Sequence, residues 1–326
     1  MKVLFSEKLT EDFLEEVKKD LPFENERVAI KLHMGEPRNT NRLKPAEVKP
    51  FVDLLRSLGC EVFLFDSTVA YKGKRNSVAG YLEVARNNGF SEESMGCPVI
   101  IGDLESEIVK GRIEYEICKE LCNTSVLVLT HVKGHVCAGI GGAIKNLGMG
   151  AVTKITKERI HEEAKPVYIS GCVKCGRCVE RCPENAIKLG KEGPVIDMER
   201  CHGCSGCILS CPVKALEPKT EIFDVLLTEA AMAAISKFRK VYYVNFLVRM
   251  GKECDCVNKP VEIIVDDIGV LASSDILSIE QASFDLVKKK VGYDPFEKES
   301  GKSFEEQLRA AEHMNLGERN YELVKV

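Results

Sequence analysis

Hydrophobic residues recur along this chain in two patterns, which together predict alternating strands and helices. Short apolar runs bounded by glycine, proline or charged residues are typical of buried strands. Longer segments with apolar positions three or four residues apart predict helices that begin near proline or a polar cap and end at glycine. The predicted strands are residues 28–34, 61–66, 98–103, 125–132, 240–247 and 261–265. The predicted helices are residues 45–58, 77–88, 220–237, 278–290 and 304–314.

This alternation predicts an α/β fold with a mostly parallel sheet. The pattern stops at about Lys165, and from there to Pro218 the chain is dense in cysteine, glycine and proline. After Pro218 the alternation returns. We therefore predict an α/β body in two parts, residues 1–165 and residues 219–326, with a small domain of residues 166–218 inserted between them. Such insertions are tolerated where the two ends of a surface loop lie close together.

The inserted segment contains an internal repeat. Residues 172–187 and residues 201–216 each read Cys-x2-Cys-x2-Cys-x3-Cys-Pro, and every cysteine, the proline and an alanine superpose at one constant offset. Three closely spaced thiolates can surround one cluster, while the fourth cysteine of each repeat reaches the other cluster. The spacing predicts one 4Fe–4S cluster on Cys172, Cys175, Cys178 and Cys211. It predicts a second on Cys201, Cys204, Cys207 and Cys182.

The alternative for these cysteines is a pair of structural zinc sites. Zinc sites of this kind usually separate two Cys-x2-Cys pairs by a longer loop. The repeated short spacing with a terminal Cys-Pro instead resembles the two-cluster bacterial ferredoxin over its whole length. We therefore expect residues 166–218 to form an α+β domain of that kind, with Gly176, Gly203 and Gly206 letting backbone N–H groups approach the clusters.

Composition and charge narrow the environment and the partners. Hydrophobic residues make up 44% and charged residues 29% of the 326-residue chain, as in ordinary globular proteins. The formal net charge of −4 argues against nucleic acid or an anionic membrane as the main partner. No signal peptide or membrane-length apolar run is visible, and 15 cysteines suit metal ligation in a reducing cytosol. We expect a cytoplasmic protein with a redox partner protein, and the oligomeric state, a homo-oligomer included, stays open.

A glycine-rich segment with basic side chains follows the most apolar strand. Six glycines lie between Gly134 and Gly150, both included. Such a turn at the carboxyl edge of a sheet brings N–H groups and positive charge to a ligand, and it suits a small anionic substrate. The alternative is a turn made only for close packing. From this segment we predict catalytic roles for His135 and Lys145, with cofactor contacts from the other residues: Lys133, Gly141, Gly142 and Asn146.

Two further groups are candidates for the same edge. Lys31 and His33 share one face at the end of the first core strand, with Glu36 after them, and we predict catalytic roles for both. Cys254 and Cys256 are two residues apart, so on an extended chain their sulfurs point to one side, where they could contact a cofactor or a soft metal. The alternative is a loop with two ordinary thiols. Cys118 and Cys122 are expected on a helix, as core residues.

Several of these segments resemble a family of unassigned function. The segments are residues 31–36, 130–135, 141–150, 254–256 and 267–275, and they look like the family called domain of unknown function 362. Many members carry a ferredoxin segment in this position. The resemblance implies a bacterial or archaeal iron–sulfur protein and names no reaction.

A second resemblance concerns the pattern His135-x3-Gly139-x-Gly141-Gly142-x2-Lys145. It is similar to a segment of the nickel-pincer lactate racemases, where the lysine anchors the nickel cofactor and the histidine lies in the active site. Gly141 stands where that family usually has serine. The similarity implies a related α/β fold with its site in the same place.

Three functions compete on these observations. The first is an iron–sulfur oxidoreductase or electron-transfer protein, which passes electrons from two clusters to a small anion held at the basic edge. The second is a simple ferredoxin-type carrier whose α/β body serves for docking. The third is a racemase-like or cofactor-handling enzyme in which the clusters are accessory. The sequence favours the first, because a simple carrier needs only the inserted segment.

Overall fold

An eight-stranded sheet lies at the centre of the computed structural model, which describes residues 1–326. Its strand order is β18-β1-β17-β14-β7-β2-β3-β4. The strands are β1 (Lys2–Ser6), β2 (Arg27–Lys31), β3 (Glu61–Ser67), β4 (Val99–Gly102), β7 (Ser125–His131), β14 (Val241–Leu247), β17 (Gly269–Ser273) and β18 (Glu322–Lys325). Only β17 runs antiparallel to its neighbours. The predicted α/β class with a mostly parallel sheet is therefore confirmed.

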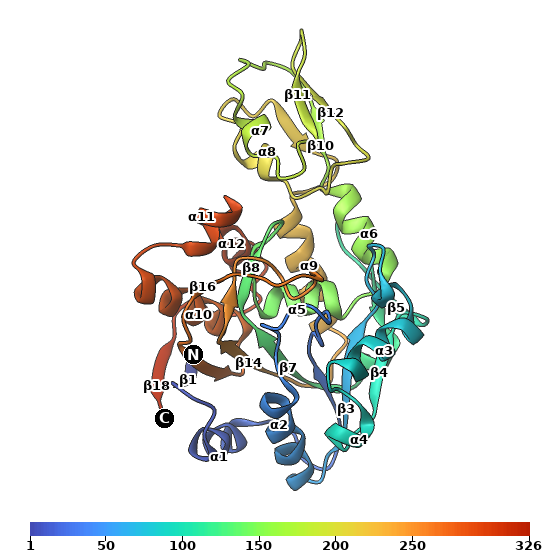
Figure 1. Cartoon of the computed structure of the whole chain (residues 1–326), viewed down its shortest axis with the longest axis vertical. Helices are drawn as coiled ribbons and strands as arrows, with labels where there is room; N and C mark the ends of the chain where they lie inside the picture. The colour runs from blue at the N-terminus through green and yellow to red at the C-terminus, as the bar shows by residue number, and fades with distance from the viewer.

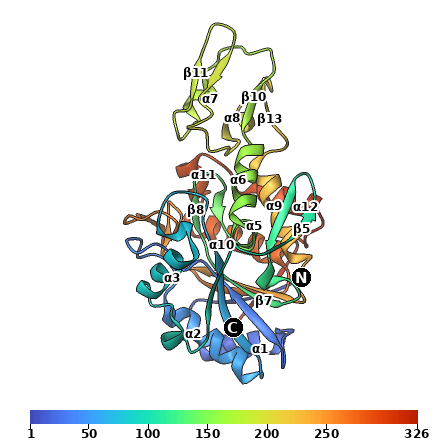
Figure 2. The same cartoon turned by 90° about the vertical axis from the view of Figure 1, so that its right-hand side faces the viewer.

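Helices cover both faces of this sheet (Figures 1 and 2). Successive residues of a strand point to opposite faces, so Val126 and Val128 of β7 join one core cluster while Leu127 and Leu129 join the other. The first cluster packs against α5 (Ala143–Gly150), α9 (Phe223–Ile235), α10 (Ile276–Val291) and α12 (Glu305–His313). The second packs against α1 (Glu11–Asp20), α2 (Pro45–Ser57) and α3 (Val78–Asn87). Burial on both faces explains why the central strands are continuous apolar runs.

Residues 166–218 form a small lobe that stands out from one end of the body in both views (Figures 1 and 2). Its two ends pair with each other, because β10 (Pro166–Tyr168) lies antiparallel to β13 (Leu216–Pro218). A second hairpin joins β11 (Ile187–Leu189) to β12 (Pro194–Ile196). Two short helices, α7 (Arg177–Glu180) and α8 (Gly206–Leu209), lie within the two cysteine repeats. The small lobe enters from α6 (Lys154–Glu163) and leaves toward α9.

The small lobe is fixed to the body by buried polar contacts. The Lys302 ammonium group donates to the carbonyl of Cys204 at 2.9 Å, and it also pairs with the Asp224 carboxylate of α9 at 2.5 Å. The Ser205 hydroxyl donates to the Ala164 carbonyl and accepts from the N–H of Phe223. Because buried polar groups must be paired, these contacts define how the small lobe sits on the body.

Some local expectations need correction. Cys118 and Cys122 do not share a helix: Cys118 ends β6 (Glu114–Cys118), and Cys122 follows the 3₁₀ turn η2 (Lys119–Leu121). The β6 strand pairs with β5 (Ser106–Lys110), and this pairing outweighs the helix-like spacing of the two cysteines. Residues 261–265 contain β16 (Ile263–Val265), which pairs with β15 (Met250–Gly251) outside the main sheet.

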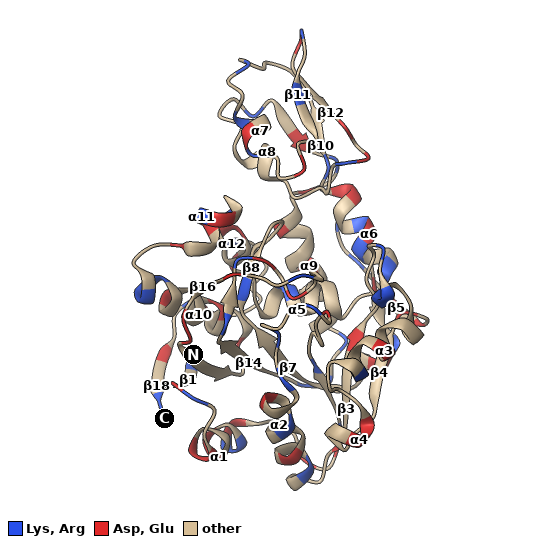
Figure 3. Cartoon of the chain, viewed as in Figure 1, with Lys and Arg blue, Asp and Glu red and all other residues tan.

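The remaining elements are short, and several lie at the carboxyl edge of the sheet. They are β8 (Lys133–His135), β9 (Gly139–Gly141), α4 (Glu92–Met95), α11 (Pro295–Ser300) and the 3₁₀ turn η1 (Lys74–Asn76). None of the helices combines the length and the hydrophobicity that a membrane span requires. Acidic and basic side chains are interspersed over the helices of both layers (Figure 3).

Candidate functional site

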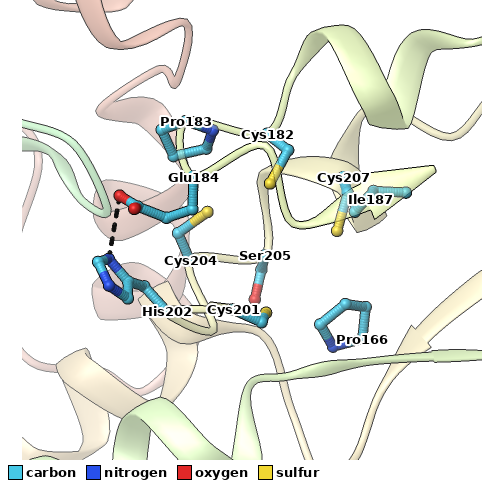
Figure 4. Close-up of a pocket in the computed structure, with 10 residues that line it drawn as sticks. All are labelled: Pro166, Cys182, Pro183, Glu184, Ile187, Cys201, His202, Cys204, Ser205 and Cys207. Carbon is cyan, nitrogen blue, oxygen red and sulfur yellow. Dashed lines mark ion pairs between the residues drawn. The ribbon is translucent and has the colours of Figure 1, made fainter. Parts of the chain in front are cut away.

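The eight cysteines of the small lobe line two separate cavities. Cys182, Cys201, Cys204 and Cys207 line one of them, here named the proximal cavity (Figure 4). Cys172, Cys175, Cys178 and Cys211 line the other, here named the distal cavity. In each cavity three cysteines come from one repeat and the fourth from the other. These are the two sets of four that the spacing predicts, and their iron–sulfur content stays a prediction.

The backbone around these cavities is arranged in the same way in both repeats. Positive φ angles occur at corresponding positions, Lys174 with Gly203 and Asn185 with Lys214. The turns aim N–H groups at sulfur: Lys174 and Gly203 donate to Cys172 and Cys201, and Ala186 and Ala215 donate to Cys182 and Cys211. N–H donors stabilise negative charge on thiolates and on the clusters that they hold. The donor set and its surroundings therefore fit two 4Fe–4S clusters.

The two cavities differ in their surroundings. The proximal cavity faces the body, since the carbonyl of Cys204 accepts from Lys302 and Gly203 lies against the carbonyl of His161. Both cavities are lined by residues of the small lobe, and Cys175 at the edge of the distal cavity is exposed.

A second group of polar side chains lies at the carboxyl edge of the main sheet. The chain leaves β7 at His131 and turns through the β8–β9 ribbon into α5, which carries Lys145 and Asn146. Gly141 lies beside two lysines, because a Cβ added there would be 3.5 Å from both Lys133 Cε and Lys145 Cδ. The edge thus gathers residues that are far apart in sequence.

Buried carboxylates neutralise most of the positive charge at this edge. Lys31 pairs with Asp66 at 3.0 Å and Arg75 pairs with Glu36 at 2.6 Å. The Asp255 carboxylate serves both His131, at 2.8 Å, and Lys133, at 3.1 Å. These pairs hold the walls of the site in place, since breaking one would leave an unpaired buried charge.

The positive charges at this edge control the pKa of the Asp255 carboxyl. Burial alone would raise the pKa of its carboxyl, yet the positive charges of His131 and Lys133 outweigh burial and hold that pKa well below its usual range. Asp255 therefore stays ionised beside His131 and Lys133.

Lys145 differs from the other cations because it has no carboxylate partner. Its ammonium group lies 3.8 Å from the sulfur of Cys254. Burial alone would lower the pKa of Lys145, but the neighbouring sulfurs of Cys254 and Cys256 outweigh it and raise that pKa. The Cys256 thiol hydrogen bonds to Cys254 and, with Lys145 and Lys133, holds the pKa of Cys254 well below its usual range, although burial opposes this. The site therefore favours a Cys254 thiolate paired with the Lys145 ammonium.

His135 completes a group of possible ligand atoms. One of its ring nitrogens and the sulfurs of Cys254 and Cys256 all lie within 4.8 Å of one another, close enough to hold a metal ion. However, Nδ1 of His135 accepts from the N–H groups of Cys137 and Ala138 at 3.1 and 3.2 Å. Burial, with the charge of Lys145, lowers the pKa of His135 well below its usual range, so the ring is neutral and its proton sits at Nε2.

His33 is neutral as well. Burial and the adjacent Arg75 guanidinium hold its pKa well below the usual range. Nε2 of His33 lies 2.8 Å from Nη1 of Arg75, which can only donate, while Nδ1 faces the N–H of Gly35 at 3.1 Å. Both predicted histidines of the edge therefore present uncharged rings.

Most of the chain matches a known protein family. Residues 28–285 match the family model described as domain of unknown function, DUF362. The chain belongs to the DUF362 family. The match covers the sheet edge and the whole small lobe of this DUF362 protein, and the family description names no activity.

Two solved structures are similar to this DUF362 chain at low sequence identity. A structural-genomics structure of a Thermotoga maritima protein has a TM-score of 0.48 at 10% identity, over 88% of this chain and 60% of that one. The lactate racemase apoprotein of Thermoanaerobacterium thermosaccharolyticum has a TM-score of 0.39 at 12% identity, over 75% of this chain and 50% of that one. The DUF362 chain thus spans less than two thirds of the length of either protein. None of the curated proteins compared with the sequence matches it.

Gly142 and Asn146, which were predicted to contact a cofactor, instead contact side chains of the DUF362 chain itself. Gly142 lies against the carboxylate of Glu280, which accepts from the N–H of Ala143 at 2.7 Å. The N-terminus of α5 is therefore already occupied by a carboxyl group. Asn146 accepts from Lys31 at 2.7 Å and donates to the carbonyl of Leu129 at 3.0 Å, so it links α5 to the sheet.

The structure also brings in residues that the sequence patterns do not single out. Asp255 lies between Cys254 and Cys256, and Glu280 lies inside α10, a helix that contains no recognisable motif. Lys302 follows α11 in a segment without periodicity, yet it bonds the carbonyls of both Cys204 and Cys137.

Proposed function

We propose that this DUF362 chain is an iron–sulfur protein that carries two 4Fe–4S clusters and transfers electrons to a small anionic substrate or cofactor at the carboxyl edge of its sheet. Ferredoxin-type clusters supply transfer of one electron at a time. Cys172, Cys175, Cys178 and Cys211 would hold the distal cluster, and Cys182, Cys201, Cys204 and Cys207 the proximal one.

The observation that carries this proposal is the position of Lys302. Its ammonium group donates to the carbonyl of Cys204, a residue of the proximal cavity, and at 2.5 Å to the carbonyl of Cys137 in the body. Cys137 in turn donates its N–H to His135 at 3.1 Å. A short series of bonded groups thus joins the proximal cavity to the sheet edge, and such proximity is what transfer between a cluster and its acceptor needs.

The sheet edge supports the choice of an anionic substrate. Lys145 is half-buried and keeps its charge without a carboxylate partner, whereas Lys31, Lys133 and Arg75 are neutralised. A carboxylate or phosphate beside Lys145 would gain a charge-assisted hydrogen bond. His33 and His135, both neutral and half-buried, would contact the uncharged part of that molecule.

Metal and sulfide analysis of anaerobically purified protein, with EPR after dithionite reduction, tests the clusters. We expect about eight irons and eight sulfides per chain, with coupled reduced-cluster signals. Stoichiometric zinc without sulfide would show instead that the eight cysteines form structural zinc sites. Binding of small carboxylates and phosphates, compared between the protein and a Lys145→Met variant, tests the anion site separately.

A further inference from the structure

We propose that Cys254 and Cys256 form a redox-active dithiol that exchanges two electrons with the clusters of the small lobe. The inference rests on the proposed function, which supplies the electrons. It adds a second kind of redox centre, made of the chain's own residues, at the sheet edge.

The backbone already holds the two sulfurs together. The N–H of Val257 donates to the carbonyl of Cys254 at 3.1 Å, so residues 254–257 form a turn and the two cysteines lie at its first and third positions. Their sulfurs lie within 4.8 Å of each other. A disulfide between them therefore needs only rotation of the side chains and a small closure of the turn.

The turn is anchored on every side. The Asn39 amide donates to the carbonyl of Cys254 at 3.2 Å, and the N–H of Glu36 donates to the carbonyl of Asp255 at 3.2 Å. The Asp255 side chain, between the two cysteines, points to His131 and Lys133. This anchoring keeps the sulfurs at the sheet edge in both redox states.

The charges around the pair favour a reactive thiolate. Lys145 is the one cation of this edge without a carboxylate, and its nearest acceptor is the sulfur of Cys254. Thiolates beside a lysine are the ones that attack disulfides and accept oxidation most readily. Cys254 is buried and Cys256 is half-buried, so solvent reaches the second sulfur more easily.

The alternative is that Cys254, Cys256 and His135 hold a resident metal ion, and the hydrogen bonds of His135 argue against it. A ligating histidine offers the lone pair of one nitrogen and usually donates the N–H of the other. In His135 the lone pair of Nδ1 already accepts from Cys137 and Ala138, which leaves the hydrogen on Nε2. Neither nitrogen therefore has a free lone pair, and two sulfurs alone make an incomplete site for zinc.

The electron balance matches the cofactors of the proposed function. Reduction of the Cys254–Cys256 disulfide consumes two electrons, and two clusters release one each on returning to their oxidised state. The S–S bond breaks, Cys254 remains as a thiolate beside Lys145, and Cys256 takes one proton from solvent. The external reductant that recharges the clusters is a low-potential one-electron donor. His135 accepts from the Cys137 backbone, and one of its ring nitrogens lies within 4.8 Å of both thiol sulfurs, so it lies between the two kinds of centre.

The test uses the anaerobic, cluster-loaded protein. Samples are equilibrated in dithiothreitol buffers of defined potential, quenched in acid, alkylated and digested with trypsin. The peptide that follows Lys252 contains Cys254 and Cys256 and no other cysteine, so its mass reports this pair alone. We expect only the disulfide and the doubly alkylated peptide, in a ratio that changes about tenfold for every ~30 mV.

Coupling to the clusters is tested by adding dithionite to the disulfide form. We expect the disulfide to be reduced about tenfold more slowly in a Cys201→Ser variant than in the parent protein, because dithionite then lacks the cluster route. Cys175→Ser, at the exposed distal edge, replaces Cys201→Ser if that variant does not fold. Cys97→Ser is the matched control, because it alters a buried thiol in the hydrophobic core that packs against α1, α2 and α3. It should behave like the parent.

The outcomes separate the two proposals. Two alkylated cysteines at every potential, in protein that contains iron and sulfide, would overturn the dithiol and leave the proposed function standing. A metal ion retained in stoichiometric amount and lost in Cys254→Ser would overturn it as well. Equal reduction rates in the parent and in the cluster-deficient variants would refute the coupling. Absence of iron and sulfide in the starting protein would instead refute the proposed function.

Discussion

The ammonium group of Lys302 lies 2.5 Å from a carboxylate oxygen of Asp224, and the two side chains are only 4% and 0% exposed. The same ammonium bonds the carbonyls of Cys137 and Cys204 and lies over the ring of Phe223. One cation thus satisfies three buried acceptors, two in the body and one in the small lobe. Lys302 adds to the contacts of Ser205 in attaching the small lobe, and no other lysine or arginine side chain donates to the backbone of the proximal repeat, residues 201–216.

Replacing Lys302 by methionine should destabilise the protein strongly. The Asp224 carboxylate would then be buried without its partner, which typically costs about 3–5 kcal/mol. We expect a drop of this size in the free energy of unfolding, measured by denaturant titration of the anaerobic protein.

The double variant Lys302→Met/Asp224→Leu is the matched comparison. It removes the unpaired charge but still leaves the carbonyls of Cys137 and Cys204 without a donor. It should therefore recover at least about 1 kcal/mol of the loss without reaching the parent stability. A double variant no more stable than Lys302→Met would contradict the pairing.

Glu280 should make stability depend on pH. Burial raises the pKa of its carboxyl from 4.5 to about 7, although the N–H of Ala143 and the Asn245 amide favour the ionised form. The folded state then binds more protons than the unfolded state between these two values. Its stabilising contribution is complete below pH 4.5 and is lost as the pH rises to 7, by about 3 kcal/mol.

The Glu280→Gln variant isolates this effect. Its amide oxygen can still accept from Ala143 and Asn245, but the side chain does not titrate. The difference in the free energy of unfolding between the parent and Glu280→Gln, measured from pH 5 to pH 8, should change in favour of the variant. A difference that is constant over this range would mean that Glu280 is not protonated on folding.

The sequence predicted those features that depend on short-range pattern. The seven residues of β7, all buried, read as a strand because both sides of a parallel strand are covered. The carboxyl edge followed from the same logic, because strands β2 and β7 end beside Lys31 and His131. The repeat also groups the cysteines, since one constant offset relates the positive φ positions of the two halves.

Long-range contacts could not be predicted from the local sequence pattern. Nothing in the local pattern around Lys302 indicates Asp224, and nothing in α10 indicates that Glu280 fills the turn at Gly142. Cys118 and Cys122 have the spacing of a helix, but pairing with β5 extends the chain instead. In each case a tertiary contact decides the outcome, and intrinsic propensity is only a weak guide.

Lys145 should control the reactivity of Cys254. A Lys145→Met variant removes the cation 3.8 Å from the sulfur, so the pKa of the Cys254 thiol should rise. Alkylation slows once that pKa exceeds the pH of the assay, because the thiolate fraction then falls, so we expect Cys254 to be alkylated more slowly at pH 7 in the variant than in the parent. The rate is measured with iodoacetamide by mass spectrometry of the peptide that follows Lys252.

Lys110→Met, an exposed change on β5, is the control for general loss of positive charge. It should leave the alkylation rate unchanged. Equal rates in Lys145→Met and the parent would show that Cys254 does not depend on this lysine for its thiolate form.

Gly203 and Gly171 separate the packing of the small lobe from simple backbone strain. Both have positive φ angles, +59° and +74°, so alanine at either position costs about 1–2 kcal/mol of conformational energy. At Gly171 an added methyl meets nothing within 4 Å, whereas at Gly203 it would lie 1.9 Å from the carbonyl oxygen of His161. Because that neighbour is backbone, Gly203→Ala must move the proximal repeat away from α6.

We expect Gly203→Ala to lose iron and to be cut faster by protease between the small lobe and the body, while Gly171→Ala keeps its iron. Similar behaviour of the two variants would mean that the contact between Gly203 and His161 does not hold the proximal cavity against the body.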